Sequence, residues 1–178
     1  MENAIPKYMF NLITDITPSQ LREMGVKAIG IDLDNTTVYD NRLKFLRGVP
    51  GWIKKMKQEG FTICIVTNTY TLRAAIIGHK LHIPYFALSD KPSTKNIFRA
   101  AKKAGVNIDE FAMIGDRLFS DVLAANKAGA ISIKTEAFRN EKFLRKKNEK
   151  RREKEAAYMA KHRPEFLKLL RGRTNDKN

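Results

Sequence analysis

The sequence predicts an α/β fold of the Rossmann type, a three-layer sandwich in which a parallel sheet of about five strands lies between helices. Short apolar runs alternate with longer helical stretches between residues 27 and 135, a pattern typical of strands joined by right-handed crossovers. Residues 61–67 carry almost no charge, as expected of a strand that is buried on both faces. Polar residues follow four of the strands, at the sheet edge where open α/β proteins bind ligands.

The first elements precede the alternating region. Residues 5–16 mix aromatic and aliphatic side chains with few charges, so they either cover the core or form an exposed apolar patch that meets lipid. A short helix is expected to follow, because Thr17 is a capping residue type and Pro18 suits the first helical position. Gly25 ends this helix.

The remaining elements follow one pattern, in which an apolar strand precedes a helix that ends near a glycine. Gly60, Gly105 and Gly129 stand where three of the helices end. The expected strands are residues 27–32, 61–67, 84–88, 111–115 and 130–134, and the expected helices are residues 50–58, 71–81, 93–104 and 120–128.

The charge of the chain is strongly basic and unevenly distributed. Lys and Arg number 34 against 19 Asp and Glu, a formal charge of +15. Residues 1–138 hold 19 basic and 13 acidic side chains (+6), whereas residues 139–178 hold 15 and 6 (+9). We therefore predict a domain of residues 1–138 and a basic tail of residues 139–178, helical or partly disordered. Such a tail suits nucleic acid or an anionic membrane surface, or is simply a solvated helix.

Cysteine content and hydropathy predict the compartment. The single cysteine, Cys64, lies in an apolar run and has no partner, which favours a reducing compartment. The start of the chain lacks the pattern of a signal peptide, and no run approaches the roughly 18 apolar residues of a spanning helix. We expect a cytoplasmic protein, peripheral at the inner face of the membrane if it meets one.

The polar residues at the strand ends combine into one candidate site. Taken singly, each has a structural explanation as a cap, a turn residue or a surface cation. Together they gather acids, a hydroxyl, an amide and a cation on one edge of the sheet. They are Asp32 and Asp34 after the first strand, Thr67 and Asn68 after the second, Lys91 after the third, and Asp116 and Asp121 after the fourth.

This set of residue types predicts phosphoryl transfer. Clustered carboxylates repel one another unless a hard cation neutralises them, and Mg²⁺ prefers oxygen ligands completed by a substrate phosphate. One carboxylate can attack phosphorus while its neighbour carries the proton to the leaving oxygen. Charge that develops on the phosphoryl oxygens needs fixed donors, which Thr67, Asn68 and Lys91 can supply.

These residues resemble the four motifs of the haloacid dehalogenase (HAD) superfamily. The matching elements are Asp32-x-Asp34-x-Thr36, Thr67, Lys91 and Gly115-Asp116-x-x-x-x-Asp121, in the family's order over residues 27–135. The resemblance implies a HAD-like Rossmann domain that hydrolyses phosphomonoesters through an aspartyl-phosphate.

The same resemblance implies a role for each residue. Asp32 would be the nucleophile and Asp34 the general acid and base. Mg²⁺ would be held by Asp32, the backbone carbonyl of Asp34 and Asp116, with Asp121 supporting them. Thr67 and Lys91 would bind and neutralise the phosphoryl group.

Local stretches are similar to the YqeG-like branch of HAD subfamily IIIA, the phosphatidylglycerophosphate phosphatases. The most specific is Gly115-Asp116-Arg117-Leu118-Phe119-Ser120-Asp121, continuing to Asn126. Only 33 positions separate Asp34 from Thr67, and 24 separate Thr67 from Lys91, too few for an inserted substrate-binding cap domain. An uncapped site favours a large substrate.

The resemblance therefore implies that a lipid head group, phosphatidylglycerophosphate, is the substrate, with the basic tail on an anionic membrane. The alternatives are a HAD phosphatase for nucleic-acid ends or small soluble phosphates, and a non-catalytic RNA- or ribosome-binding protein on a HAD scaffold. The sequence makes no prediction of the oligomeric state. Cys64 is expected in the core, and Trp52 in the core or lining the open site. The three histidines are not spaced as a metal site and are expected to face solvent or a helix end.

Overall fold

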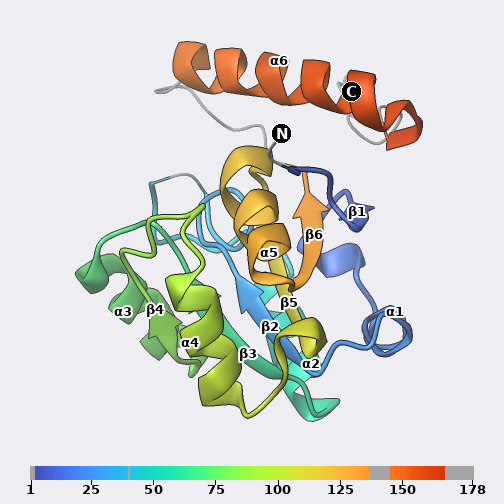
Figure 1. Cartoon of the computed structure of the whole chain (residues 1–178). Helices are drawn as coiled ribbons and strands as arrows, with labels where there is room; N and C mark the ends of the chain where they lie inside the picture. Colours follow the sequence, from blue (N-terminus) through green and yellow to red (C-terminus); the bar gives the residue numbers. More distant parts are fainter. Residues whose placement is uncertain (1–2, 40, 137–144, 167–178) are drawn as a thin grey trace. The chain divides into compact units, whose positions relative to one another are not determined.

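A six-stranded parallel sheet organises the protein, which we describe from a computed structural model over residues 3–39, 41–136 and 145–166. The strand order is β1-β6-β5-β2-β3-β4 (Figure 1). The predicted α/β Rossmann-type fold is confirmed. The strands are β1 (Tyr8–Phe10), β2 (Ala28–Ile31), β3 (Thr62–Val66), β4 (Tyr85–Phe86), β5 (Phe111–Gly115) and β6 (Ile131–Thr135).

Helices cover both faces of this sheet (Figure 1). Those of the first unit are α1 (Pro18–Glu23), α2 (Val49–Gln58), α3 (Thr71–Leu81), α4 (Lys95–Ala104) and α5 (Leu123–Ala128), with short turns η1 (Ile13–Asp15), η2 (Ile108–Glu110) and η3 (Leu118–Val122). The predicted helix 71–81 has the observed bounds, whereas the predicted helix 120–128 is a π-helical turn, η3, followed by α5.

The amino-terminal segment supplies a strand that the sequence analysis did not predict. Tyr8 to Phe10 pair in parallel with Ile133 to Thr135 of β6, so the sheet has six strands rather than about five. A strand of three residues is too short to show alternation of apolar and polar side chains. Residues beside it do cover the core, since Ile13 and Ile16 are buried.

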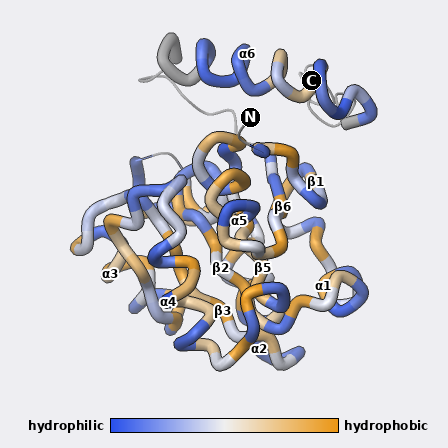
Figure 2. The backbone as a smooth tube through the Cα atoms, in the orientation of Figure 1, coloured by the Kyte–Doolittle hydropathy of each residue, from blue (hydrophilic) through white to orange (hydrophobic). Residues whose placement is uncertain are grey.

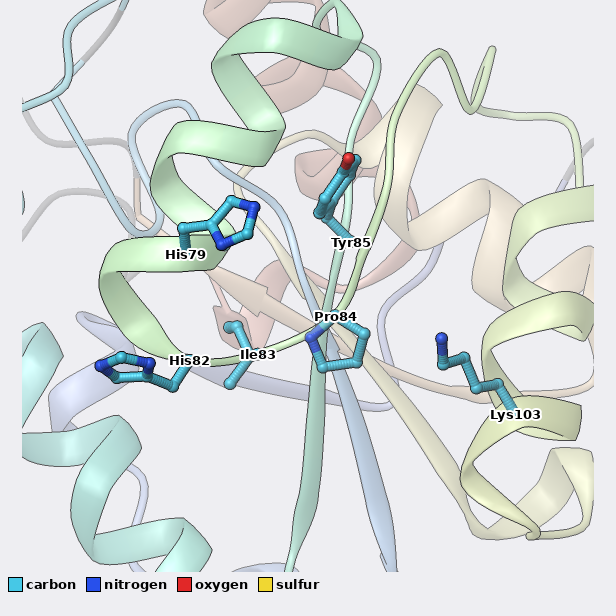
Figure 3. A pocket seen from close by; sticks show the side chains of 7 residues that line it. His79, His82, Ile83, Pro84, Tyr85 and Lys103 are labelled. Carbon is cyan, nitrogen blue, oxygen red and sulfur yellow. The ribbon is translucent and has the colours of Figure 1, made fainter.

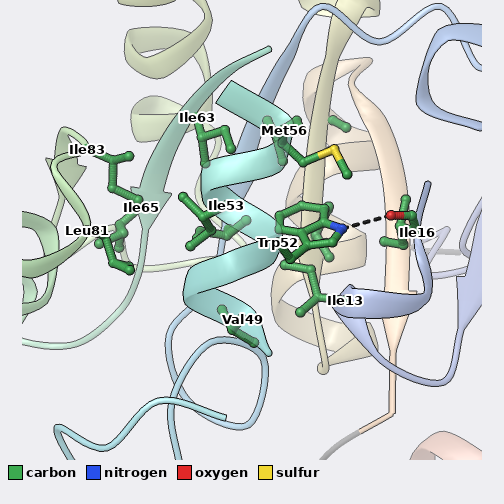
Figure 4. Close-up of a cluster of buried hydrophobic side chains, with 14 of the residues drawn as sticks. Ile13, Ile16, Val49, Trp52, Ile53, Met56, Ile63, Ile65, Leu81 and Ile83 are labelled. Atoms are coloured by element: carbon green, nitrogen blue, oxygen red, sulfur yellow. Dashed lines mark hydrogen bonds between the residues drawn. The ribbon is translucent and has the colours of Figure 1, made fainter. Parts of the chain in front are cut away.

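The core consists of two apolar layers because successive strand residues point to opposite faces of the sheet. On one face, side chains such as Ile31 and Ile65 pack in the same cluster as residues of α2 and α3. Trp52 of α2 lies in this cluster, and its indole Nε1 donates a hydrogen bond of 2.7 Å to the Ile16 carbonyl oxygen (Figure 4). On the other face, Val66 and Phe111 pack in a cluster with residues of α4 and α5.

The order of the strands determines where a ligand can bind. The chain moves outward from β2 to β3 and β4, and then returns to place β5 on the other side of β2. Neighbouring crossovers leave the carboxyl ends of β2 and β5 in opposite directions, which opens a crevice at that edge. The loops after β2, β3 and β5 carry the predicted site residues.

The chain divides into two compact units, Met1–Phe138 and Arg139–Asn178. The second contains α6 (Arg145–His162) and the short turn η4 (Pro164–Phe166), and α6 is largely hydrophilic (Figure 2). Within α6, the rings of Tyr158 and His162 stack with centroids 4.3 Å apart. Tail residues 139–144, and the end that was expected to be disordered, lie outside the described residues. None of the described helices combines the length and hydropathy needed to span a membrane.

Candidate active site

A buried lysine joins the carboxyl ends of three strands. The Lys91 ammonium donates to the Val66 carbonyl oxygen at 2.7 Å and to Asp32 Oδ1 at 2.8 Å, and its Nζ lies 2.6 Å from Asp121 Oδ1. Lys91 is 5% exposed and Asp32 is 7% exposed. Three acceptors thus surround one ammonium group in a site that is largely closed to water.

Burial and ion pairing act in opposite directions on these groups. Burial raises the pKa of the Asp32 carboxyl to about 6, although Lys91 pulls it down. Burial alone would lower the pKa of Lys91, but the carboxylates of Asp121 and Asp32 outweigh burial and hold that pKa above its usual value. The lysine therefore stays charged, and Asp32 has a perturbed pKa of the kind that functional carboxyls often show.

Three carboxylates meet beside this lysine. Asp32, Asp116 and Asp121 each place one oxygen within 4.8 Å of the other two, and all three residues are buried. Asp116 directly follows β5, and η3 brings Asp121 back over the end of that strand. The Arg117 backbone N–H fixes Asp121 by a hydrogen bond of 3.1 Å to Oδ2. The carboxylate oxygens suit a hard divalent cation.

Gly115 makes the approach of Asp121 possible. A Cβ atom on Gly115 would collide with the carboxyl carbon and Oδ2 of Asp121. Glycine at this last position of β5 therefore has a steric reason, because any larger residue would displace the carboxylate that pairs with Lys91.

The loop after β2 returns on itself and positions Asp34. The Thr37 hydroxyl donates to the Asp32 carbonyl oxygen at 2.7 Å, and the backbone N–H groups of Thr37 and Val38 both donate to the Leu33 carbonyl oxygen. Asn35 takes a left-handed conformation with φ of 60°, which asparagine tolerates better than most residues. The Asp34 carboxylate is not one of the three clustered carboxylates.

Arg73 holds the Asp34 carboxylate. Its two terminal nitrogens donate to Asp34 Oδ1 at 2.6 Å and Oδ2 at 3.0 Å, and the Asn41 backbone N–H donates to Oδ1 at 2.9 Å. Arg73 also donates to the Arg42 carbonyl oxygen and to the Thr69 hydroxyl. This bidentate pair fixes both the direction and the plane of the carboxylate.

Arg73 was not among the predicted site residues. A signal was present, because it lies four residues before Ile77 and eight before Leu81, both on the buried face of α3. An arginine at that spacing needs a carboxylate or several carbonyl oxygens as partners.

The loop after β3 supports Lys91 from the other side. The Asn68 side chain accepts from the Lys91 backbone N–H at 2.8 Å and donates to the Lys91 carbonyl oxygen at 3.1 Å. Thr67 is buried, and its hydroxyl accepts from the Thr69 backbone N–H at 3.3 Å. The side chain of Asn68 thus fixes the backbone that carries Lys91.

A cavity of about 190 Å³ joins most of these groups. Its lining includes Asp32, Asp34, Thr67, Asn68, Lys91 and Asp121 of the predicted set, with Thr69, Arg117 and Ser120 in addition. The structure therefore brings the predicted residues to one edge of the sheet. The Asp34 carboxylate does not join the three-carboxylate cluster, and its predicted metal contact is through the backbone carbonyl. The metal and catalytic roles of these residues stay predictions.

A larger hollow, of about 530 Å³, lies elsewhere, at the amino end of β4 and the carboxyl end of α3. His79, His82 and Lys103 line it together with Tyr85 (Figure 3). Of the described residues that line it, none is a carboxylate. His79 and His82 are exposed, as expected of residues near a helix end.

The two residues expected in the core are both buried. Trp52 is 6% exposed, and Cys64 is 4% exposed with its thiol pKa raised to about 12 by burial. A thiol with that pKa is not ionised near neutral pH and cannot act as a nucleophile.

Known proteins are similar to this chain in sequence. Residues 13–129 match the family described as haloacid dehalogenase-like hydrolase. The chain is 34% identical over 125 residues to "Probable phosphatase YqeG" of Bacillus subtilis, an alignment that covers 70% of this chain and 73% of the relative. It is 27% identical over 108 residues to "Glyceraldehyde 3-phosphate phosphatase" of Methanopyrus kandleri, covering 54% of this chain and 46% of that one.

A solved structure shares the fold at lower identity. The cobalt-bound deoxy-D-mannose-octulosonate 8-phosphate phosphatase of Haemophilus influenzae superposes with a TM-score of 0.52 at 19% identity. The match covers 63% of this chain and 69% of that chain.

Proposed function

We propose a specific activity for this chain, which belongs to the haloacid dehalogenase-like hydrolase family and is one of its phosphatases. In this proposal the chain is a Mg²⁺-dependent hydrolase of phosphatidylglycerophosphate. The observation that carries the proposal is the pairing of two differently held acids. Asp32 is buried against Lys91, and Asp34, two residues later, is held by Arg73. In this proposal the first acid attacks phosphorus and the second transfers the proton.

The donors beside Asp32 fit a divalent cation. The three carboxylates of Asp32, Asp116 and Asp121 are buried together, an arrangement that repels itself unless positive charge is added. Lys91 and Arg117, whose Nε lies 3.9 Å from Asp116 Oδ1, supply two positive charges against the three negative ones. Mg²⁺ bound there would supply the remaining charge and draw electron density from the phosphoryl oxygens.

In the first step, an Asp32 oxygen forms a bond to phosphorus as the ester P–O bond breaks. Asp34, protonated, gives its proton to the leaving alcohol oxygen. The Thr67 hydroxyl and the remaining side-chain N–H of Asn68 donate to the phosphoryl oxygens, and Lys91, whose three N–H groups already have acceptors, adds its positive charge beside them. The products of this step are phosphatidylglycerol, which takes the proton on its glycerol oxygen, and an acyl phosphate on Asp32.

In the second step, water replaces Asp32 on phosphorus. Asp34, now ionised, accepts a proton from the water that attacks. The bond between phosphorus and the Asp32 oxygen breaks, which releases inorganic phosphate and restores the carboxylate. Arg73 keeps Asp34 directed to the same place in both steps, so that one group serves as acid and then as base.

Three observations support a lipid as the substrate. The cavity is small, about 190 Å³, so it accommodates a phosphate and little more of a large molecule. The stretch between β2 and β3 forms a loop and α2, and that between β3 and β4 forms α3, so in these described segments no second domain covers the site. The basic residues 139–178, with a charge of +9, suit an anionic membrane surface, where each basic residue contributes about 1 kcal/mol. The enzyme would act in the cytoplasm, peripherally on the inner face of the membrane.

The decisive experiment measures phosphate release from phosphatidylglycerophosphate in mixed micelles, beside sugar phosphates, nucleotides and oligonucleotides with 3′- or 5′-phosphates. We expect Mg²⁺-dependent turnover that is fastest on the lipid. Preference for an oligonucleotide would instead assign the basic tail to nucleic acid.

Substitution of the nucleophile tests the chemistry itself. Asp32→Asn should abolish release from every substrate, including a soluble aryl phosphate, while circular dichroism shows a folded protein. Asp109→Asn, a change at an exposed aspartate, should leave turnover unaltered. Activity retained by Asp32→Asn would disprove the role of this residue.

A further inference from the structure

Exposed apolar side chains lie beside the entrance of the candidate active site. Among the described residues, seven large apolar side chains are exposed, and the three most exposed all lie at this edge. With a fourth from the loop after β2, they form what we call the rim patch. Its members are Leu43 (43% exposed), Tyr70 (60%), Leu72 (71%) and Leu88 (65%).

Hydrogen bonds hold the segments of the rim patch together. Arg73 donates to the Arg42 carbonyl oxygen at 2.8 Å and to the Thr69 hydroxyl at 3.2 Å. The Leu88 backbone N–H donates to the Thr69 carbonyl oxygen at 3.0 Å. Every other member of the rim patch is the immediate chain neighbour of Arg42, Thr69 or Arg73. The four apolar side chains therefore come from three segments joined at one point.

The same contacts place the rim patch beside the catalytic cavity. Asp34 and Thr69 line that cavity, and both accept hydrogen bonds from Arg73. None of the four rim residues lines the cavity itself. Apolar surface therefore adjoins a phosphate-sized cavity without being part of it.

Basic side chains accompany the rim patch. Residues 41–48 contain Arg42, Lys44 and Arg47, all exposed, and no acidic residue. The Lys44 ammonium lies over the Tyr39 ring at 5.7 Å from its centroid. At a phospholipid interface, exposed apolar side chains can contact the acyl chains while neighbouring basic side chains contact the lipid phosphates.

We propose that the rim patch inserts into the interfacial layer of an anionic lipid bilayer and so sets the catalytic cavity against the head groups. The inference rests on the proposed function for its substrate, but lipid insertion can be measured without turnover. A bilayer fits better than a second copy of this chain, because a two-fold contact would bring the three basic residues of each copy together. The bilayer instead offers opposite charge and an apolar layer at once.

Insertion can be detected with a fluorescent reporter in the full chain. Trp52 is the single tryptophan of the chain and is buried, so it contributes a constant background. In the variant Tyr70→Trp we expect a blue shift on vesicles of phosphatidylglycerol and phosphatidylcholine, and quenching by lipids brominated on their acyl chains. An indole that stays unquenched on bound protein would overturn the proposal, since binding would then be electrostatic alone.

A paired substitution tests the contribution of the rim patch to affinity. Leu72→Ser with Leu88→Ser should weaken partitioning onto the same vesicles about tenfold, because two apolar side chains no longer enter the acyl layer. Phe98→Ser is the matched control, since Phe98 is 48% exposed but lies on α4, and it should bind as the unaltered protein does. The difference should persist in about 1 M salt, where a Debye length near 3 Å screens the contribution of the basic tail.

The outcomes separate this inference from the proposed function. Hydrolysis of a soluble aryl phosphate should be the same in the paired variant and the unaltered protein. Equal vesicle binding by the two would overturn the docking role and leave the phosphatase assignment intact. A dimer in analytical ultracentrifugation that the paired substitution dissociates would assign the rim patch to self-association and also overturn the proposal. If the unaltered protein inserts into the bilayer but has no phosphatase activity, the proposed function is refuted and the docking role remains.

Discussion

At the scale of single residues, the site differs from a simple cluster of acids. Asp32 and Asp34 are two positions apart in sequence but have different partners, because Lys91 pairs with the first and Arg73 with the second. Each carboxylate is therefore held in its own environment, which is how two chemically identical groups can have separate roles.

Arg73 should act as a positioning residue for Asp34. Arg73→Lys keeps the positive charge but cannot form two parallel bonds to one carboxylate. We expect kcat to fall about 10- to 100-fold for an alkyl phosphate, whose leaving oxygen needs a proton, and much less for an activated aryl phosphate. Steady-state kinetics on both substrates measure the difference.

The exposed Arg99 offers the matched control for this prediction. Arg99→Lys on α4 should change neither rate. An equal loss on alkyl and aryl phosphates in Arg73→Lys would mean that Arg73 does not act through proton transfer by Asp34.

The raised pKa of Asp32 predicts how Mg²⁺ binding depends on pH. With a pKa of about 6 in the metal-free protein, Asp32 is ionised above that pH and protonated below it. Because the cation needs the ionised form, its affinity should fall up to about tenfold for each pH unit below 6 and stay level above it. Calorimetric titration with Mg²⁺ between about pH 5 and pH 7.5 measures this. Affinity that is constant across the range would contradict it.

At the scale of elements, β5 and η3 together position the Asp121 carboxylate. The strand ends in a glycine, and the π-helical turn brings Asp121 into the space that a side chain on that glycine would occupy. Extra or widened turns of this kind are common at functional sites, where they change the direction of a side chain.

Gly115→Ala should displace Asp121 from this position. We expect a loss of about 1–3 kcal/mol in the free energy of unfolding and a large fall in kcat, because Asp121 must leave Lys91. Gly51→Ala is the control, since no atom beyond its chain neighbours and its own helix backbone lies within 4 Å of its Cβ position in α2. This change should stabilise the protein by up to about 1 kcal/mol. Urea unfolding and turnover of an aryl phosphate give both quantities. A fully active Gly115→Ala protein would show that the position of Asp121 is not required.

The sequence predicted the elements whose signals are local and missed those that depend on tertiary contacts. Helix α3 was predicted to the residue because its apolar spacing is regular. Strand β1 was missed because its three residues gain their partners only from β6, more than 120 residues away. The acids, Thr67 and Lys91 were predicted from their places at strand ends. Arg73 was missed because it belongs to a helix, and only the folded loop brings Asp34 to it.

At the scale of the whole molecule, charge is divided between the two compact units. Residues 1–138 carry +6 and residues 139–178 carry +9. The groups of the candidate active site all lie in the first unit. We propose that the second unit serves attraction to an anionic surface and takes no part in the chemistry.

Removal of residues 139–178 should therefore affect binding and not chemistry. We expect at least tenfold weaker binding to anionic vesicles at low salt, since each basic residue near the surface contributes about 1 kcal/mol. Turnover of a soluble aryl phosphate should stay within about twofold. Cosedimentation and phosphate release measure the two effects. Unchanged vesicle binding would show that the tail serves another partner.

The sheet order has a consequence for how the protein behaves when concentrated. Its two outermost strands are its shortest, β1 with three residues and β4 with two. Pro6 stands two residues before β1 and Pro84 directly before β4, and a proline has no N–H to offer to an incoming strand. Open sheets can aggregate by pairing their exposed edges, and short edges beside proline give a foreign strand little to pair with. The long strands of this sheet, which a foreign strand could extend, all lie inside it.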